Sequence, residues 1–308
     1  MTRSTGHPIQ HRPTTTRQES SDMSIASSAI HAPNQFVEID GRRLAYRDIG
    51  SATGTPIVLC TRFRGNMDVW DPLFLDTLGA QGLRVITFDY SGLGLSTGVP
   101  DYDPAALAKD ASDLMKALKL GRSVIAGWSL GGIAAQVFLA LFPEQVSHVV
   151  VIGSVPPGPN VKPAEQLFFD TANIPDYTLE DQTILFFEPK SAASREAARR
   201  SVDRIASRTA GRSVPVPHGW AREYLGTSPK SPLFPSDAVL QVMKTTAVPI
   251  LHVGGDHDII FPVENWYALN QVLPTVRLLT FPSSGHGPQH QHPVAAGEGI
   301  ASFIRSAK

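Results

Sequence analysis

A chain of 308 residues with 42% hydrophobic side chains is long enough to bury a full core, as one large α/β domain or as two modest ones. Its formal net charge of −1 provides no long-range attraction to nucleic acid or to an anionic membrane, so we expect neither as a partner. Cys60 is the single cysteine, which excludes an internal disulfide. Because no stretch approaches the roughly 18 apolar residues of a membrane helix and the N-terminus lacks an apolar signal region, we expect a cytoplasmic protein.

Residues 1–34 are rich in Ser, Thr, Arg, Gln and His and contain few large apolar side chains. Such a segment cannot bury enough apolar surface to offset the entropy that ordering costs. We therefore predict a disordered leader over residues 1–34. Met23 is an alternative start of the natural chain.

Residues 35–154 are predicted to form the first part of an α/β core. Two alternating segments flank Asp40-Gly41, a strong signal for a β-hairpin. Continuous apolar runs, typical of parallel strands covered on both faces, then alternate with segments of helical periodicity. Asp103-Pro104 supplies a cap residue and a proline at the first helical position. The predicted strands cover 36–39, 43–48, 56–60, 84–88, 123–126 and 146–152, and the predicted helices cover 70–81 and 104–118.

The alternation stops at residue 155 and resumes near residue 248. Between them prolines recur, no strand is evident, and helical patches occur over Ala164–Phe169, Leu179–Phe187 and Ala193–Ala206. This stretch is too long for an ordinary loop, so we predict that residues 155–247 form a helical lid. The core then continues over 248–308, with strands over 249–253 and 277–281 and helices over 262–272 and 294–305. Alternating strands and helices imply a parallel sheet with right-handed crossovers.

The central motif of the chain is Gly127-Trp128-Ser129-Leu130-Gly131, between the strand that ends at Ala126 and a helical pattern. A sharp strand-to-helix turn of this kind exposes the serine hydroxyl and tolerates no bulk two residues to either side. We predict Ser129 to be a catalytic nucleophile. Its base and the group that orients the base should lie just past the ends of other strands.

Two later strands end in suitable residues. Asp256-His257-Asp258 follows the strand over 249–253, and His286 follows the strand over 277–281. This arrangement predicts a Ser129–His286–Asp258 triad, in which His286 is the general base and Asp258 orients it. Asp256, two residues earlier in the same turn, is the rival acid.

At this point the chain resembles the α/β-hydrolase superfamily over about 36–307. Its nucleophile elbow matches the Ser129 turn, its D-x-x-G-x-G-x-S turn matches Asp89–Ser96, its G-x-x-D acid turn matches Gly255–Asp258 with Pro262, and its C-terminal G-H matches Gly285-His286. The resemblance implies an α/β-hydrolase fold: a mostly parallel eight-stranded sheet with helices on both faces and a helical lid insertion.

The resemblance also implies an oxyanion hole made by two backbone amides. The Leu130 amide is the first, and Phe63 stands where the second is expected. The loop usually reads His-Gly there, whereas this chain has Thr61-Arg62, which puts a side chain where the backbone normally runs close.

Arg62 and Arg64 are candidate substrate-binding residues, because a guanidinium can hold a substrate carboxylate through two parallel hydrogen bonds. The alternative is that they pair with Asp68 or Asp71, or lie in solvent. We also count Trp128, next to the nucleophile, among the candidate substrate-binding residues.

The tail supplies a rival mechanism. His286, His290 and His292 have H-x3-H-x-H spacing, and Asp256-His257-Asp258 adds more ligand types, so a metallohydrolase is an alternative. These residues lie in turns flanked by Pro and Gly, and a metal mechanism would leave the serine elbow unused. We therefore predict no metal site and expect His290 and His292 at the surface.

We predict a serine hydrolase that cleaves a small carboxylic ester or lactone through an acyl-serine intermediate, without a cofactor. Within the family that it resembles, a serine at the elbow disfavours haloalkane dehalogenases and epoxide hydrolases, which use aspartate. A haloperoxidase-like, cofactor-free perhydrolase, a C–C bond hydrolase and a hydroxynitrile lyase remain alternatives, as does a non-catalytic ligand-binding member. A homodimer is compatible with the sequence.

Overall fold

The computed structural model describes residues 1–2, 28–227 and 236–306, and its centre is one eight-stranded sheet. The strand order is β1-β2-β4-β3-β5-β6-β7-β8. β2 pairs antiparallel with β1 and β4, and every other neighbouring pair is parallel. The strands are β1 (Gln35–Ile39), β2 (Arg42–Gly50), β3 (Thr55–Cys60), β4 (Leu83–Phe88), β5 (Ser123–Trp128), β6 (Val146–Ile152), β7 (Ile250–Gly255) and β8 (Val276–Phe281). This is the mostly parallel sheet that the sequence predicts.

The hairpin of β1 and β2 forms where it is predicted. Asp40 and Gly41 both have positive φ angles, 49° and 77°, as the two central residues of a type I′ turn require. The four strands β3, β5, β6 and β7 contribute almost only buried residues, so helices must cover both faces of the sheet.

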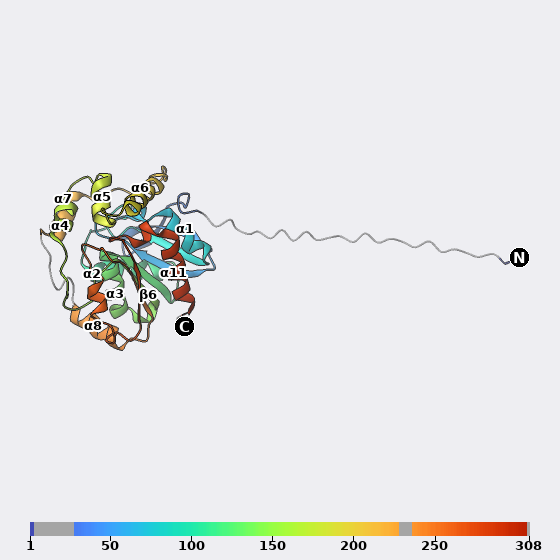
Figure 1. Ribbon diagram of the computed structural model, residues 1–308. Helices are drawn as coiled ribbons and strands as arrows, with labels where there is room; N and C mark the ends of the chain where they lie inside the picture. The colour runs from blue at the N-terminus through green and yellow to red at the C-terminus, as the bar shows by residue number, and fades with distance from the viewer. Residues whose placement is uncertain (3–27, 228–235, 307–308) are drawn as a thin grey trace.

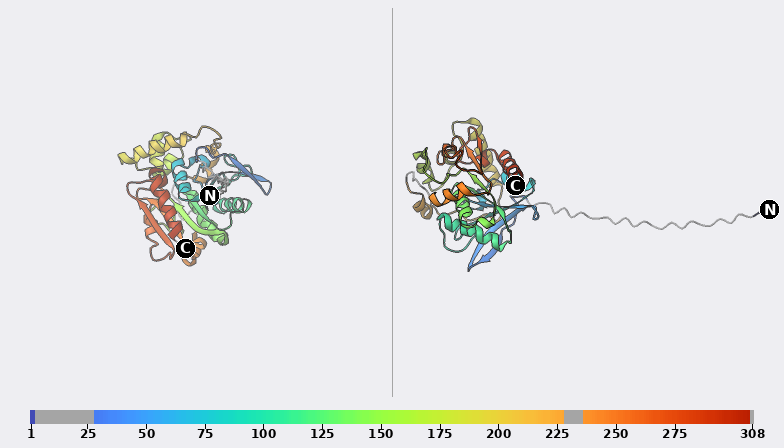
Figure 2. Two further views of the ribbon diagram at one scale, coloured as in Figure 1. Left: turned by 90° about the vertical axis from the view of Figure 1, so that its right-hand side faces the viewer. Right: turned by 90° about the horizontal axis from the view of Figure 1, so that it is seen from below.

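Helices pack on both faces of the sheet (Figures 1 and 2). α1 (Pro72–Ala80) packs against α11 (Pro293–Ser306) on one face, and α2 (Pro104–Ala117) packs against α3 (Leu130–Leu141) on the other. Short helices complete the core: α9 (Glu264–Tyr267), α10 (Pro288–Gln291) and the 3-10 turns Met67–Val69 and Pro143–Gln145. Within the described ranges, no helix is long and apolar enough to cross a membrane.

In its described residues, the insertion (155–247) consists of helices joined by loops, without a strand. It contains α4 (Gln166–Ala172), α5 (Leu179–Phe186), α6 (Ala192–Ala206), α7 (His218–Leu225) and α8 (Ser236–Thr245). The first three confirm the predicted helical patches. α4 to α7 gather beyond one end of the sheet, whereas α8 returns to the core beside α3 (Figure 1).

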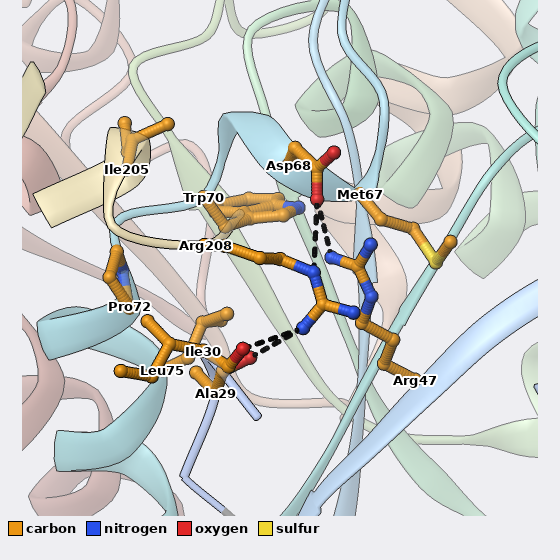
Figure 3. Close-up of a pocket in the computed structure, with 10 residues that line it drawn as sticks. All are labelled: Ala29, Ile30, Arg47, Met67, Asp68, Trp70, Pro72, Leu75, Ile205 and Arg208. Carbon is orange, nitrogen blue, oxygen red and sulfur yellow. Dashed lines mark hydrogen bonds and ion pairs between the residues drawn. The ribbon is translucent and has the colours of Figure 1, made fainter. Parts of the chain in front are cut away.

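The prediction of disorder is wrong for residues 28–34. Residues 3–27 lie outside the described residues, but residues 28–34 pack on the core, where Ala29 and Ala32 are buried. The Ala29 amide donates to Asp76, and Arg208 donates to the carbonyls of Ala29 and Ile30. Figure 3 shows Arg208 beside Ala29 and Ile30. Its guanidinium also approaches the carboxylate of Asp68. Small alanines fit against the core here, which composition alone does not reveal.

The predicted helix over 262–272 is also shorter than expected. α9 ends at Tyr267 and turns follow, with Gln271 in the left-handed region at φ 67°. The Trp266 indole donates to the Ser154 carbonyl at 2.7 Å. The short helix is thereby fixed to the segment that follows β6, and the chain then turns back towards β8.

Candidate active site

Ser129 lies at the sharp turn between β5 and α3, with φ 59° and ψ −121°. This backbone geometry is rare for a residue with a side chain, and residues held in it cluster at functional sites. A Cβ at Gly127 would collide with the Gly131 carbonyl, and a Cβ at Gly131 would collide with the Cys60 carbonyl. The Ser129 amide donates to the Ile152 carbonyl at 2.9 Å, which fixes the turn to β6. The two flanking glycines are therefore required by packing.

Asp258 and His286 form a buried pair at the ends of neighbouring strands. The His286 Nδ1 atom lies 2.8 Å from the Asp258 Oδ2 atom, and both side chains are almost fully buried. The other carboxylate oxygen accepts the amides of Ile260 and Phe261, each at 2.9 Å. Burial alone would raise the pKa of Asp258, but His286 and these two amides outweigh burial and lower it. Asp258 is therefore ionised at neutral pH, so the proton between the two groups resides on Nδ1.

Asp256 points elsewhere. Its Oδ1 atom lies 2.6 Å from His257 Nδ1, and both side chains are partly exposed. It also accepts the Ser284 amide at 3.3 Å. Of the two acids in this turn, Asp258 is the one that contacts His286.

The loop after β3 forms a tight turn despite the loss of the usual glycine. The Gly65 amide donates to the Arg62 carbonyl at 2.9 Å, and Arg64 takes a positive φ of 54°. The Arg64 amide donates to the Tyr102 hydroxyl, which leaves Phe63 at the turn's tip. Neither the Phe63 nor the Leu130 amide donates to a group of the described residues. Leu130 is the first residue of α3, where helix amides lack partners within the helix.

Arg64 is occupied by the insertion. Its guanidinium donates to the carbonyls of Ala172, Ile174 and Pro175, and it lies over the Tyr177 ring at 4.4 Å. Carbonyls at the end of α4 lack partners within the helix and attract a positive charge. Arg64 thus binds the end of α4. It neither pairs with Asp68 or Asp71 nor lies free in solvent, and its donors are not left for a substrate carboxylate.

Arg62 likewise pairs with neither acid named as an alternative. Asp68 pairs with Arg47 at 2.7 Å, and Asp71 pairs with Arg204 (Figure 3 shows Asp68). The Arg62 side chain instead turns inward over the rings of Trp128 and Phe186, at 5.2 and 4.6 Å. Because a guanidinium stacks readily on aromatic faces, a side chain replaces the usual glycine here without loss of packing.

Trp128 is a buried wall of the site. Its indole donates to the His286 carbonyl at 2.8 Å and therefore holds the histidine loop against β5. The ring contacts Phe186 and lies 4.7 Å from the ring of His290.

The surface position predicted for His290 is wrong. His290 is only 3% exposed, and its Nδ1 atom lies 2.9 Å from the Ser201 hydroxyl of α6. His292 is partly buried and stacks on Phe281 at 4.8 Å. In the part of the chain that the structure describes, no group of His, Cys, Asp or Glu is placed to hold a metal ion.

Three cavities adjoin these residues. We call them the apolar pocket, the junction and the chamber. The apolar pocket, of about 190 Å³, contains Ser129 and Leu130 in its wall, and the chamber has a volume of about 600 Å³. The junction holds little more than one water and is lined by Ser129, His286 and Arg62. The remaining apolar-pocket residues are mostly aromatic or aliphatic: Phe63, Tyr102, Pro104, Ile133, Phe168, Phe169, Tyr224, Leu225, Ile260 and Phe261.

Sequence reasoning missed part of this wall. Ile260 and Phe261 directly follow the acid turn, and their position next to Asp258 could have identified them. The contact between His290 and Ser201 joins segments 89 residues apart, and no local signal indicates it.

Residues 55–293 match the family model described as alpha/beta hydrolase fold. The chain belongs to this family, as its sheet and serine elbow also indicate. It is 25% identical to a Mycobacterium tuberculosis protein provisionally named a non-heme bromoperoxidase, over 86% of this chain and 98% of that protein. It is 29% identical to a Synechocystis protein provisionally named a non-heme chloroperoxidase, over 84% and 94%. The solved structure of an alpha/beta hydrolase fold protein from Chitinophaga pinensis is similar with a TM-score of 0.74 and 25% identity, covering 91% of this chain and 100% of that one.

Proposed function

We propose that this chain is a serine hydrolase that cleaves small carboxylic esters or lactones through an acyl-serine intermediate. The observation that carries the proposal is that Ser129, on its strained turn, lines the same cavity as His286, and that the buried Asp258 holds the other side of the His286 ring. These are the three parts that activation of a serine hydroxyl requires: nucleophile, base and orienting acid.

In the first half of the reaction, the Ser129 oxygen attacks the substrate carbonyl carbon while His286 Nε2 accepts the hydroxyl proton. Asp258 accepts a hydrogen bond from Nδ1–H at 2.8 Å, which leaves a lone pair on Nε2, and its negative charge stabilises the imidazolium that forms. The lowered pKa of Asp258 keeps this carboxylate charged throughout. His286 then gives the proton to the leaving alkoxide, and the alcohol departs.

The amides of Leu130 and Phe63 are the proposed donors to the oxyanion. Both residues line the apolar pocket together with Ser129, and neither amide has a hydrogen-bond acceptor among the described residues. Fixed donors at the place where negative charge develops lower the barrier to both tetrahedral intermediates. In the second half, water attacks the acyl-serine carbonyl with His286 as base, and the acid and free Ser129 are released.

We propose further that residues 155–247 act as the lid of this site. Phe168 and Phe169 of α4 and Leu225 of α7 line the apolar pocket from this insertion. They exclude water from the acyl-serine except where the junction admits it. An apolar substrate group of modest size therefore fits this side of the scissile bond.

Replacing Ser129 with alanine tests the mechanism. On p-nitrophenyl butyrate we expect kcat to fall by about 10⁴-fold or more, because nucleophile removal in a triad has effects of this size. A fluorophosphonate probe should label the wild-type chain at Ser129 and leave the variant unlabelled. Full activity in Ser129→Ala would refute the mechanism.

A cofactor-free perhydrolase is the second candidate, because the names of two relatives refer to haloperoxidases. Here hydrogen peroxide would replace water as the attacker of the acyl-serine, which yields a peracid. Assaying the wild-type chain with acetate, peroxide and bromide, beside its ester hydrolysis, discriminates the two. Bromination that exceeds hydrolysis would favour the perhydrolase.

A further inference from the structure

Arg62 carries a charge that the protein does not neutralise. Its Nη1 atom donates to the Phe63 carbonyl at 2.7 Å, and this is its one hydrogen bond among the described residues. No carboxylate of those residues lies within ion-pair distance of it, and its Nε atom is sealed from solvent without a partner. Every other arginine of the site region is satisfied differently: Arg47, Arg204, Arg208 and Arg212 contact carboxylates, and Arg64 binds carbonyls.

A guanidinium deep in a protein without a counter-ion is costly to keep. Burial lowers the pKa of Arg62 to about 10, which still leaves it charged at neutral pH. The faces of Trp128 and Phe186 stabilise the charge in part. These ring faces do not replace hydrogen-bond acceptors for the Arg62 N–H groups, so N–H donors of the guanidinium remain for a ligand.

The accessible part of Arg62 faces the cavities. The side chain is half-buried, and its Nη2 atom, unlike Nε, is not closed off, yet it has no partner within the described part of the chain. Arg62 lines both the chamber and the junction, where Ser129 and His286 lie. A ligand group held by Nη2 therefore belongs to a molecule that also reaches the serine.

The charge balance of the chamber is positive. Arg62, Arg64 and Arg212 line it, and Asp68 is the one acid among its lining residues. Asp68 is already surrounded by Arg47, Arg208 and Arg212, at 2.7, 3.7 and 3.9 Å. His290, also in the wall, has its pKa lowered by burial to about 4 and is neutral at pH 7. No described lining group therefore offers Arg62 a compensating charge.

We propose that Arg62 binds a carboxylate of the substrate, so that the natural substrate is an anionic ester or lactone. Its scissile carbonyl lies at the junction, its apolar group lies in the apolar pocket, and its carboxylate arm extends into the chamber. This inference rests on the proposed function for the position of the scissile bond. The carboxylate is held by charge-assisted hydrogen bonds that a neutral ester cannot form.

The kinetic test compares mono-p-nitrophenyl adipate with its neutral methyl diester, methyl p-nitrophenyl adipate. We expect the wild-type chain to prefer the anionic ester in kcat/KM by about tenfold or more, the range of a charge-assisted hydrogen bond. Arg62→Met should lower kcat/KM for the anionic ester by about tenfold more than for the neutral ester, so that the preference is lost. Arg62→Lys should retain part of the preference. Arg199→Met, which removes an exposed arginine of α6, is the charge-matched control and should keep the full preference.

A wild-type chain that hydrolyses both esters equally well would overturn the inference, even if Arg62→Met does not fold. Equal losses on both esters in Arg62→Met would overturn it as well, since Arg62 would then only support the loop.

A binding measurement separates this inference from the proposed function. By calorimetry, monomethyl adipate should bind to Ser129→Ala and bind at least about tenfold more weakly to Ser129→Ala/Arg62→Met. If esters were hydrolysed equally with and without Ser129, the proposed mechanism would fail while the carboxylate site stood on the binding result. If Ser129 proved essential and the two variants bound monomethyl adipate equally, the carboxylate site alone would fail.

Discussion

The junction beside Ser129 shares lining residues with both the apolar pocket and the chamber, and of these two only the chamber has charged side chains in its described wall. Aromatic and aliphatic side chains from α4, α7 and the acid turn line the pocket, whereas arginines, polar groups and His290 line much of the chamber. An ester whose two sides are chemically alike would match only one of these two walls. The difference indicates a substrate whose two ends differ, and it divides the site into parts that can be altered separately.

The largest effect should come from the junction, which both cavities share. Asp258→Asn leaves the shape of the acid turn but removes the negative charge that fixes the Nδ1 proton on His286. We expect kcat on p-nitrophenyl butyrate to fall by about 10⁴-fold, because an orienting acid replaced by its amide favours the wrong tautomer. Asp256→Asn is the matched control in the same turn, and it should stay within about threefold of wild type. If the two variants lost activity equally, the assignment of Asp258 would be wrong.

The chamber wall should show an acid-dependent loss of stability. His290 has a pKa of about 4 in the folded chain, lowered by burial, against about 6.5 when unfolded. Between these values the unfolded chain binds the extra proton, so this group lowers the free energy of unfolding as pH falls from 6.5 to 4. His290→Phe keeps a ring against Trp128 but cannot bind the proton. The fall in its free energy of unfolding over this pH range should therefore be about 2–3 kcal/mol smaller than in the wild-type chain.

Urea unfolding at pH 7 and pH 4.5 measures the effect of His290. His252 is also buried and neutral, with a pKa lowered to about 3, and it should contribute equally to both chains. A wild-type decline identical to that of His290→Phe would contradict the prediction.

The apolar pocket should give the smallest effect. Leu225→Trp fills the pocket from α7, so a bulky alcohol group should fit less well while the carboxylate arm is unaffected. We expect about a tenfold fall in kcat/KM for mono-2-naphthyl adipate, and a change within about twofold for monomethyl adipate. Leu167→Trp, on the exposed side of α4, is the control. Equal losses on both esters would mean that the pocket does not receive the alcohol group.

Much of the fold could be predicted because its signals are local. Asp40-Gly41 determines a two-residue turn, the apolar runs determine buried strands, and Gly127 and Gly131 surround Ser129 for steric reasons that their spacing already reveals. Asp258 and His286 each follow a strand in a parallel sheet, so their approach follows from topology.

The chemistry of the chamber could not be predicted in this way. Whether Arg62 is neutralised depends on where Asp68 and Asp71 find partners, and Asp71 finds Arg204, which is 133 residues away. A contact between segments 89 residues apart likewise explains the wrong surface position of His290, because Ser201 of α6 lies against it. Arg62 and Arg64 are near neighbours of equal charge, and only the tertiary structure distinguishes them.

Residues 28–34 lie between the start of the core and the segment that follows α6. Arg208, which follows α6, donates to the carbonyls of Ala29 and Ile30 and also lies near Asp68, an acid of the chamber wall. A proteolytic cut after Asn34 would remove this contact and leave Arg208 without those two acceptors. Residues 28–34 thus connect the start of the core to the end of α6, the helix that contributes Ser201, Val202, Ile205 and Ala206 to the chamber wall.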